Sequence, residues 1–234
     1  MYTESYKYYD RIYSKFKDYD SECDKILGLL KEKHPDAKTI LDVAVGTGEH
    51  ARILSEKANY IIDGVDIMPE MVEIARSKKQ SGTFYVGDMT NFDLGNTYDV
   101  VMCLFSSIGY VRTLENVFKT LGCFKKHVND NGIILVEPWF TPEVARHAYF
   151  DCAMADEDDV KIARMSHTEI VDRLHRIHFQ YLVGTKEGIE HLTEVHELGI
   201  FSQEEMLDCF KQVELKVEFD KKGLFGRGMY IARK

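Results

Sequence analysis

The chain has few features that would cross-link it or place it in a membrane. Its 234 residues include five cysteines, which are scattered and form no Cys-x-x-Cys pair. A chain of this length can bury a large hydrophobic core without a disulfide or a metal, so we expect reduced thiols and a cytoplasmic location. The first ten residues lack a basic segment followed by an apolar one, and apolar runs such as residues 100–105 are too short to span a bilayer. We therefore expect neither a signal peptide nor membrane binding.

Positive charge is also scarce. The chain has 30 lysines and arginines against 39 aspartates and glutamates, which gives a formal net charge of −9 at pH 7. This balance argues against nucleic acid as a partner, because binding to phosphate backbones requires a basic surface. It does not exclude a small anionic substrate, since a few arginines can dominate one cleft.

Apolar segments and helical segments alternate over the first 140 residues. The predicted strands are residues 39–43, 60–66, 83–87, 98–104 and 133–137. The predicted helices are residues 2–16, 20–33, 49–57, 69–79 and 113–127, with a loop at 88–97 and a turn at 129–132. Continuous apolar strands between helices are typical of a parallel sheet that is covered on both faces.

The pattern changes after Pro138. Residues 151–159 are acidic and predict a solvated loop, whereas residues 160–201 alternate apolar and polar positions and predict an inserted antiparallel sheet. A helix at 202–210, begun by a capping box of Ser202 and Glu205, and two strands at 212–219 and 228–233 complete the chain. We therefore predict an α/β fold with a seven-stranded, mostly parallel sheet, formed by residues 1–140 and 201–234. Residues 141–200 form the inserted lid or acceptor-binding region.

A glycine-containing turn marks the end of the first strand, in the segment TILDVAVGTGEH (residues 39–50). Gly46 and Gly48 lie where the strand gives way to a helix, and glycine there lets the backbone approach a ligand closely. Asp42, just before the turn, can orient an amino group of that ligand. The same turn would also suit a tight connection that binds nothing.

Acidic residues end the next two strands. Asp66 can accept two hydrogen bonds from a ribose diol, and Asp88 can accept from the exocyclic amine of adenine. Met89 and Ile67 would supply apolar contacts to the adenine ring. Each of these residues, taken singly, also has a purely structural interpretation. Asp66 can cap a helix, Asp88 can belong to a turn, and Met89 can belong to the core. Together with the glycine turn, they indicate a nucleoside-containing ligand.

A nicotinamide dinucleotide is the competing ligand. Its fingerprint G-x-G-x-x-G needs three glycines, and here Ala51 stands third, which is a degenerate match. The glycine turn alone therefore does not decide. The segment GDM (residues 87–89), the apolar strand that leads into FSSIGY (residues 105–110) and the final strand pair favour S-adenosylmethionine (SAM) instead.

In this order the motifs resemble the class I SAM-dependent methyltransferases, which have a Rossmann-like fold. The segments VVMCLFSSIGY (residues 100–110), VEPWFTPE (136–143), RMSHTE (164–169) and GRGMY (226–230) look more specifically like the N-methyltransferases of amino-sugar biosynthesis. Those enzymes methylate the amine of a dTDP-3-amino-3,6-dideoxyhexose, a precursor of desosamine- or mycaminose-type sugars. The resemblance covers nearly the whole chain.

The resemblance implies roles for individual residues. Tyr9 and Tyr19 would close over the methionine end of SAM, while Tyr110 and Tyr2 would stand beside the amine. Further residues implied around the cofactor are Ala44, Leu104 and Phe105. Residues implied around the acceptor are Ser106, Ser107, Trp139, Arg164, Ser166, His167 and Arg227. Among these, Arg164, Ser166 and Arg227 would lie near the nucleotide diphosphate, where a planar guanidinium suits a phosphate.

The chain departs from the family pattern at two places. Phe140 follows Trp139 where the family commonly has a second tryptophan, and Val45 stands where a cysteine is usual. The acceptor is therefore left open between a dTDP-amino sugar and another small amine. A peptide N-terminus, a hydroxyl acceptor and a catalytically silent SAM-binding subunit are the alternatives.

Methyl transfer from a sulfonium needs a nucleophile with a free lone pair and no obligatory base. Tyr110 is the candidate to orient the amine and to pass its proton to water. Four histidines, His175, His178, His191 and His196, occur on neighbouring predicted strands. On an alternating strand His175 and His178 point to opposite faces, so we expect no metal. The inserted sheet is a candidate surface for a homodimer, although its apolar face can equally pack on the domain.

Overall fold

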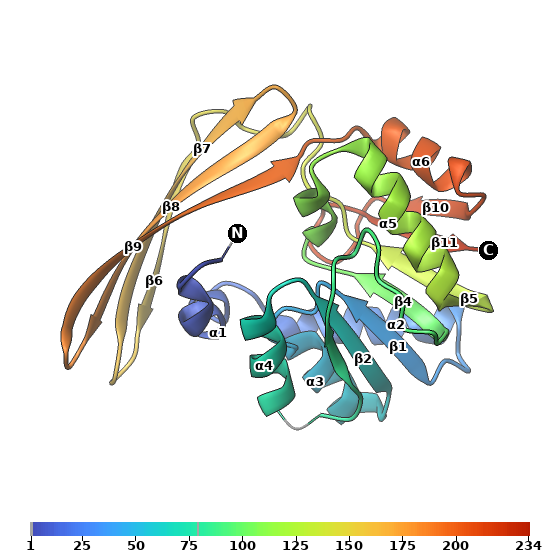
Figure 1. Ribbon diagram of the computed structural model, residues 1–234, viewed down its shortest axis with the longest axis horizontal. Helices are drawn as coiled ribbons and strands as arrows, with labels where there is room; N and C mark the ends of the chain where they lie inside the picture. Colours follow the sequence, from blue (N-terminus) through green and yellow to red (C-terminus); the bar gives the residue numbers. More distant parts are fainter. Residues whose placement is uncertain (1, 79) are drawn as a thin grey trace.

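Two separate β-sheets make up the protein. The structure is a computed structural model that describes residues 2–78 and 80–234, and within them the strands form one seven-stranded sheet and one four-stranded sheet. Figure 1 shows the smaller sheet standing to one side of the larger one, with the N-terminal helical segment between them. The predicted α/β fold class, with an inserted antiparallel sheet, is confirmed.

The larger sheet is mostly parallel. Its strands are β1 (Thr39–Val43), β2 (Ile61–Asp66), β3 (Phe84–Val86), β4 (Tyr98–Cys103), β5 (Val128–Val136), β10 (Lys216–Asp220) and β11 (Met229–Arg233). Their spatial order is β10-β11-β5-β4-β1-β2-β3, and β11 runs antiparallel to both of its neighbours. The chain builds outward from β1 first through β2 and β3, then on the other side through β4 and β5. Open α/β sheets bind ligands at the carboxyl ends of the strands beside such a switch.

Helices cover both faces of this sheet. The helices α2 (Tyr19–Lys33), α3 (Glu49–Ala58) and α4 (Pro69–Ser77) lie on one face, and α5 (Leu114–His127) and α6 (Gln203–Gln212) lie on the other. Successive residues of a strand point into opposite hydrophobic cores. Ile40 belongs to the core that contains α2, and Leu41 belongs to the core that contains α5. Fully burying such a side chain contributes about 1.5–3 kcal/mol, which explains why these strands are continuous apolar runs.

The polar residues at the helix ends agree with the predicted starts. The Ser202 hydroxyl accepts a hydrogen bond from the Glu205 amide, and the Glu205 carboxylate accepts one from the Ser202 amide. This confirms the capping box of α6. Thr113 caps α5 in the same way by accepting from the Asn116 amide.

The smaller sheet is antiparallel and packs on the N-terminal segment. Its strands are β6 (Phe150–Asp156), β7 (Lys161–Val171), β8 (Leu174–Thr185) and β9 (Gly188–Gly199), in that order across the sheet. Phe179 and Tyr181 on its inner face form a small core with Ile12, which belongs to helix α1 (Tyr9–Tyr13). The inner face is thus turned toward the larger sheet.

Some predicted elements are wrong in kind. Residues 151–159 were predicted as a loop, yet residues 151–156 belong to β6, because an edge strand paired with β7 alone can carry acidic side chains into solvent. The predicted turn at residues 129–132 lies inside β5, where the pairing with β4 shifts register between Tyr98 and Val100. These residues form a bulge in a continuous strand.

Other predicted elements are correct in kind but misplaced. The predicted helix 2–16 is the 3₁₀ turn η1 (Ser5–Tyr8) followed by the short α1. The strand predicted at 212–219 is β10, which begins at Lys216, four residues later than predicted. The reason is that α6 continues through Gln212. Lys79, the last residue of the predicted helix 69–79, lies outside the described residues.

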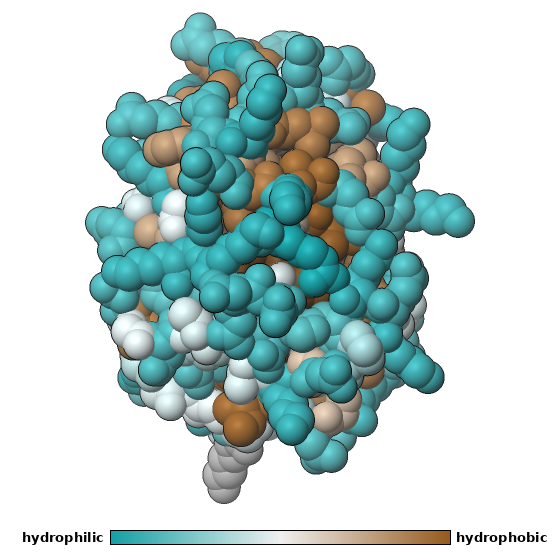
Figure 2. Space-filling view, turned by 90° about the vertical axis from the view of Figure 1, so that its right-hand side faces the viewer, coloured by the Kyte–Doolittle hydropathy of each residue, from teal (hydrophilic) through white to brown (hydrophobic). Residues whose placement is uncertain are grey.

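The face of the larger domain that carries α6 is mainly hydrophilic. Figure 2 shows polar side chains over most of this face, with hydrophobic residues visible in a hollow between them. Within the described part of the chain, none of the helices combines the length and the apolar character that crossing a membrane requires.

Candidate active site

One cavity of about 450 Å³ lies between the two sheets. Its floor is formed by the carboxyl ends of β1 and β2 and by the 3₁₀ turn η2 (Ser107–Val111), and its opposite wall by the inner faces of β7, β8 and β9. The N-terminal segment contributes three tyrosines to the lining. The N-terminal segment, the larger sheet and the smaller sheet therefore meet at one site.

A second, smaller cavity of about 40 Å³ continues beneath the first. Ala44, Gly46 and Phe105 line both cavities, so the two share walls. Asp42, Tyr19 and Leu104 line only the smaller one, together with Lys17. The residues predicted around the cofactor are thus divided between two adjoining spaces.

The glycine turn is held by its backbone geometry. Ala44 and Gly46 have φ angles of 60° and 57°, in the left-handed region, and the Gly46 amide donates to Oδ2 of Asp66 at 2.8 Å. Gly48 is also left-handed, at 74°, but it lines neither cavity. A Cβ at Gly48 would lie 3.0 Å from Cβ of Ala75, so this glycine serves the packing of α3 on α4.

Two buried carboxyl groups lie below the turn. Oδ1 of Asp66 accepts from the Met68 amide at 2.9 Å, while burial raises the pKa of Asp66. Burial, and then the charge of Asp66, raise the pKa of Asp42 to about 8. Asp42 lines the smaller cavity, so a cationic group placed there would meet its carboxyl.

The third acidic position lies at the rim of the larger cavity. Oδ1 of Asp88 accepts from the amide and from the hydroxyl of Thr90, each at 2.8 Å, which fixes the carboxylate just beyond β3. Met89 and Ile67 line the same part of the cavity. Asp88, Met89 and Ile67 therefore line the same cavity as Asp66.

Tyrosines of the N-terminal segment close the cavity from one side. The Tyr2 and Tyr13 hydroxyls are 2.9 Å apart, and the Tyr2 ring meets the Tyr9 ring edge to face at 5.2 Å. Tyr2 and Tyr9 both line the larger cavity, and their roles beside the amine and at the methionine end stay predictions. Tyr13 was missed, although it follows Tyr9 at the helical spacing of four residues.

Tyr110 is backed by a histidine and a glutamate. Its hydroxyl lies 2.6 Å from Nδ1 of His196, and Nε2 of His196 lies 3.4 Å from Oε2 of Glu194. Both partners are almost completely buried on β9. The sequence places His196 and Glu194 two positions apart and therefore on one face of a strand. It does not show that this face lies against the 3₁₀ turn η2, which carries Tyr110.

Two arginines bring positive charge to the acceptor side of the cavity. Arg164 is buried against the Tyr13, Phe16 and Phe179 rings, and its Nε and Nη1 have no hydrogen-bond partner among the described residues. Arg227 donates to the Ser106 hydroxyl at 2.9 Å. Because burial in a mostly apolar site costs free energy for a charged group, these cations suit an anionic ligand.

The aromatic residue Trp139 completes this side. Its Nε1 donates to Nδ1 of His175 at 3.2 Å, and the Arg227 guanidinium lies 5.3 Å from its ring. Ser107 and Ser166 line the cavity, as predicted, and His175 does so without having been predicted there.

Two predicted acceptor residues lie outside the cavity lining. Ser106 is completely buried and donates to the Pro138 carbonyl at 2.6 Å, so it acts below the surface as the support of Arg227. His167 is exposed and pairs across the strands with His178. Its placement in the cleft was wrong, because Arg164, Ser166 and Thr168 point inward and the residue between the last two points outward.

Metal ligation finds no support in the part of the chain that the structure describes, where no group of three or more histidine, cysteine or acidic side chains is placed to hold a metal ion. His175 lines the cavity, whereas His178 pairs with Glu169 at 3.1 Å on the other face of the sheet. The histidines therefore do not converge.

Comparisons with known proteins give the same picture. A family model described as a methyltransferase domain matches residues 40–132. Over 224 residues the chain is 34% identical to the dTDP-3-amino-3,6-dideoxy-α-D-glucopyranose N,N-dimethyltransferase of Streptomyces fradiae, covering 95% of this chain and 88% of that one. It is 31% identical to the dTDP-3-amino-3,4,6-trideoxy-α-D-glucopyranose N,N-dimethyltransferase of Streptomyces venezuelae, covering 95% and 94%.

Solved structures agree over the full length. The crystal structure of DesVI from Streptomyces venezuelae matches with a TM-score of 0.92 at 29% identity, covering 100% of this chain and 99% of that one. SAM-bound CalS10, an amino pentose methyltransferase from Micromonospora echinaspora, matches with a TM-score of 0.86 at 28% identity, covering 99% and 97%. The chain therefore belongs to the class I SAM-dependent methyltransferases, in the family of the dTDP-amino sugar N,N-dimethyltransferases.

Proposed function

We propose that this enzyme transfers two methyl groups in succession from SAM to the amine of a dTDP-amino sugar. The observation that supports this most directly is the composition of the cavity. The acidic residues at the strand ends lie on one side, the buried Arg164 and the half-buried Arg227 lie on the other side, and Tyr110 lies in the same lining. The curated relatives are named for N,N-dimethylation of such sugars.

The residues at the strand ends fit SAM. Asp66 would accept hydrogen bonds from the ribose diol, and Asp88 with Met89 would contact adenine. Asp42, which lines the smaller cavity, would bind the amino group, and Tyr9 and Tyr19 would surround the methionine end. When bound, SAM supplies an electrophilic methyl group that is already activated.

The acceptor residues fit a nucleotide diphosphate joined to a sugar. The free guanidinium nitrogens of Arg164 can donate to phosphate oxygens, and Arg227 can approach from the opposite wall. Trp139, Ser107 and Ser166 complete the proposed acceptor site. The hexose then lies between the arginines and Tyr110.

The chain contributes mainly positioning. Tyr110 holds the amine so that its lone pair faces the methyl group, with Tyr2 closing the space above it. Partial burial favours the neutral amine, which is the nucleophilic form. Holding nitrogen, carbon and sulfur in line can contribute about 7–11 kcal/mol to the lowering of the barrier.

We also propose that the outer face of the smaller sheet pairs with a second copy of the chain. Phe150, Met154 and Met165 form an exposed apolar patch on β6 and β7, with exposed fractions of 73%, 70% and 55%. A patch that covers itself across a two-fold axis is self-complementary by symmetry. A second copy of the chain is therefore the proposed partner that covers this patch.

The activity can be tested directly. Purified enzyme is incubated with SAM and a panel of dTDP-amino sugars, peptide amines and sugar alcohols, and the products are weighed by mass spectrometry. We expect a gain of two CH2 units on the amino sugars, because the relatives are dimethyltransferases. A gain on alcohols or peptides alone would contradict the proposal.

Asp66 should dominate the affinity for SAM. We expect Asp66→Asn to raise the dissociation constant by about 10- to 100-fold, since charge-assisted hydrogen bonds contribute about 1.5–3 kcal/mol each. Isothermal titration calorimetry measures this. The matched control is Asp63→Asn on the same strand, which also accepts a backbone hydrogen bond, from Thr83, but lies outside the cavity. Equal affinities of the two variants for SAM would reject the assigned role.

Asp42 should release a proton when SAM binds. Its pKa is raised to about 8, so it is largely protonated at neutral pH, and the ammonium of SAM lowers that pKa in the complex. Affinity should therefore rise as the pH approaches about 8. Calorimetry in buffers of different ionisation enthalpy should detect release of about one proton, and much less for Asp42→Asn. Identical proton release from both proteins would disprove this linkage.

The dimer has its own test. We expect Met165→Lys to convert the dimer into a monomer in sedimentation-velocity experiments, because a buried lysine at the interface is costly. Lys161→Met lies on the same strand and serves as the control, with the dimer retained. A wild-type protein that sediments as a monomer at high concentration would exclude the proposed pairing.

A further inference from the structure

We propose that His196 and Glu194 form a positioning relay behind Tyr110, which directs the tyrosine hydroxyl and takes up the proton that the amine loses after each methyl transfer. This inference rests on the proposed function, because it assigns the proton of that reaction. It concerns residues that act through Tyr110.

Hydrogen-bond chemistry sets the direction of the relay. The Glu194 carboxylate can only accept, so the Nε2 of neutral His196 that faces it carries the hydrogen. Nδ1 is then a free acceptor at 2.6 Å from the Tyr110 oxygen, and it receives the tyrosine hydrogen. The Tyr110 oxygen also accepts from the Tyr2 hydroxyl, and its remaining lone pair can accept a hydrogen from the amine, which leaves the nitrogen lone pair free.

The proton then has a balanced route. The amine lone pair forms the new N–C bond, the C–S bond electrons remain on sulfur, and the nitrogen becomes a cation. An N–H bond of this ammonium breaks as the hydrogen moves to the Tyr110 oxygen, and the Tyr110 hydrogen moves to Nδ1 of His196. The resulting imidazolium faces the Glu194 carboxylate. The amine is neutral again, which a second methyl transfer requires.

The surroundings of His196 keep the imidazole neutral before the transfer, so that Nδ1 can accept a hydrogen from Tyr110. Burial lowers its pKa, and Glu194 opposes this shift. Of the other elements packed around it, the N-terminal segment presents Tyr2, whose ring lies 4.5 Å from the imidazole, and β7 presents Arg164, whose charge lowers the pKa further. On β8, the Phe179 ring lies 5.0 Å from the imidazole, and the titratable Tyr181 interacts electrostatically with Glu194 and Tyr110.

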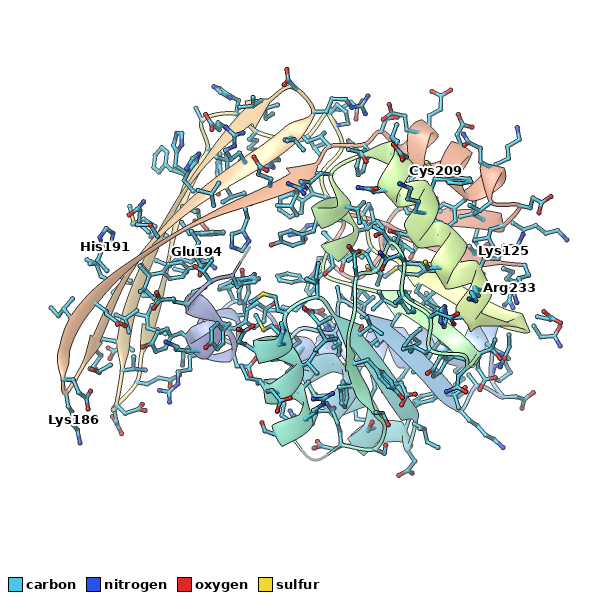
Figure 3. All side chains as sticks on the ribbon, in the orientation of Figure 1. Lys125, Lys186, His191, Glu194, Cys209 and Arg233 are labelled. Carbon is cyan, nitrogen blue, oxygen red and sulfur yellow. The ribbon has the colours of Figure 1, made fainter. Side chains whose placement is uncertain are left out.

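Glu194 also holds the N-terminal segment in place. Oε1 accepts from the amides of Thr3 at 2.7 Å, Glu4 at 3.1 Å and Ser5 at 3.0 Å, and Oε2 accepts from the Ser5 hydroxyl at 2.7 Å. Burial alone would raise its pKa, but the bonds from His196, Ser5 and Thr3 hold that pKa well below its usual value. Figure 3 shows Glu194 on the side of β9 that faces this segment, opposite His191. The carboxylate that balances the imidazolium is thus the one that fixes Tyr2 above the cavity.

The test separates proton transfer from structural support. In His196→Asn, the amide oxygen can occupy the place of Nδ1 and accept from Tyr110, but it cannot take a proton. We expect SAM affinity within about twofold of wild type, a kcat lower by about 10- to 100-fold at neutral pH, accumulation of monomethyl product and recovery of kcat as the pH rises. A residue with a structural role alone would give no such recovery.

The control is His191→Asn, on the same strand but exposed and bonded to Gln180, and it should keep the wild-type pH profile. A wild-type kcat and product ratio in His196→Asn would overturn the relay. If the proposed function itself is wrong, the result is different: the wild-type protein neither binds SAM nor methylates any member of the acceptor panel.

A second measurement does not depend on turnover. Nitrogen-15 NMR of histidine-labelled protein should show His196 as the neutral tautomer with hydrogen on Nε2, and Tyr110→Phe should shift the Nδ1 signal. A His196 that is an imidazolium at neutral pH, or signals unchanged in Tyr110→Phe, would overturn the relay whatever the acceptor is.

Discussion

The structure depends on the contact between the N-terminal segment and the inner face of the smaller sheet. Ile12 packs with Phe179 and Tyr181, and the Glu194 carboxylate binds three successive backbone amides of the same segment. Without this contact, the strand ends of the larger sheet would form an open edge. With it, that edge becomes one wall of a cavity, in which electrostatic interactions are stronger than in water.

Charge is distributed within the cavity in a way that the net charge conceals. The chain is acidic overall, yet Arg164 and Arg227 line the acceptor side, and the carboxylates of Asp66 and Asp88 lie at the strand ends. In the proposed function, the acidic side of the cavity takes SAM and the arginines take the nucleotide diphosphate, so the methyl donor and the amine meet between them.

The sequence was informative where burial alone dictates structure. The strands β1, β2 and β4 were predicted within a residue or two, because double-sided burial forces continuous apolar runs, and Asp66 and Asp88 follow from the strand ends. The edge strand β6 was missed because pairing on one side leaves acidic residues exposed. Period-two alternation placed His196 and Glu194 on one face, but only tertiary packing reveals that this face meets Tyr110. The same alternation, applied to Arg164, would have placed His167 outside the cavity.

The central claim is that the strand ends and the arginines serve one reaction in one space. A crystal structure of the enzyme with S-adenosylhomocysteine and a dTDP-amino sugar tests this most directly. The account expects the sugar nitrogen between the sulfur atom and the Tyr110 oxygen, with the diphosphate against Arg164 and Arg227. A nucleotide sugar bound outside this cavity, or a nitrogen turned away from the sulfur, would contradict it.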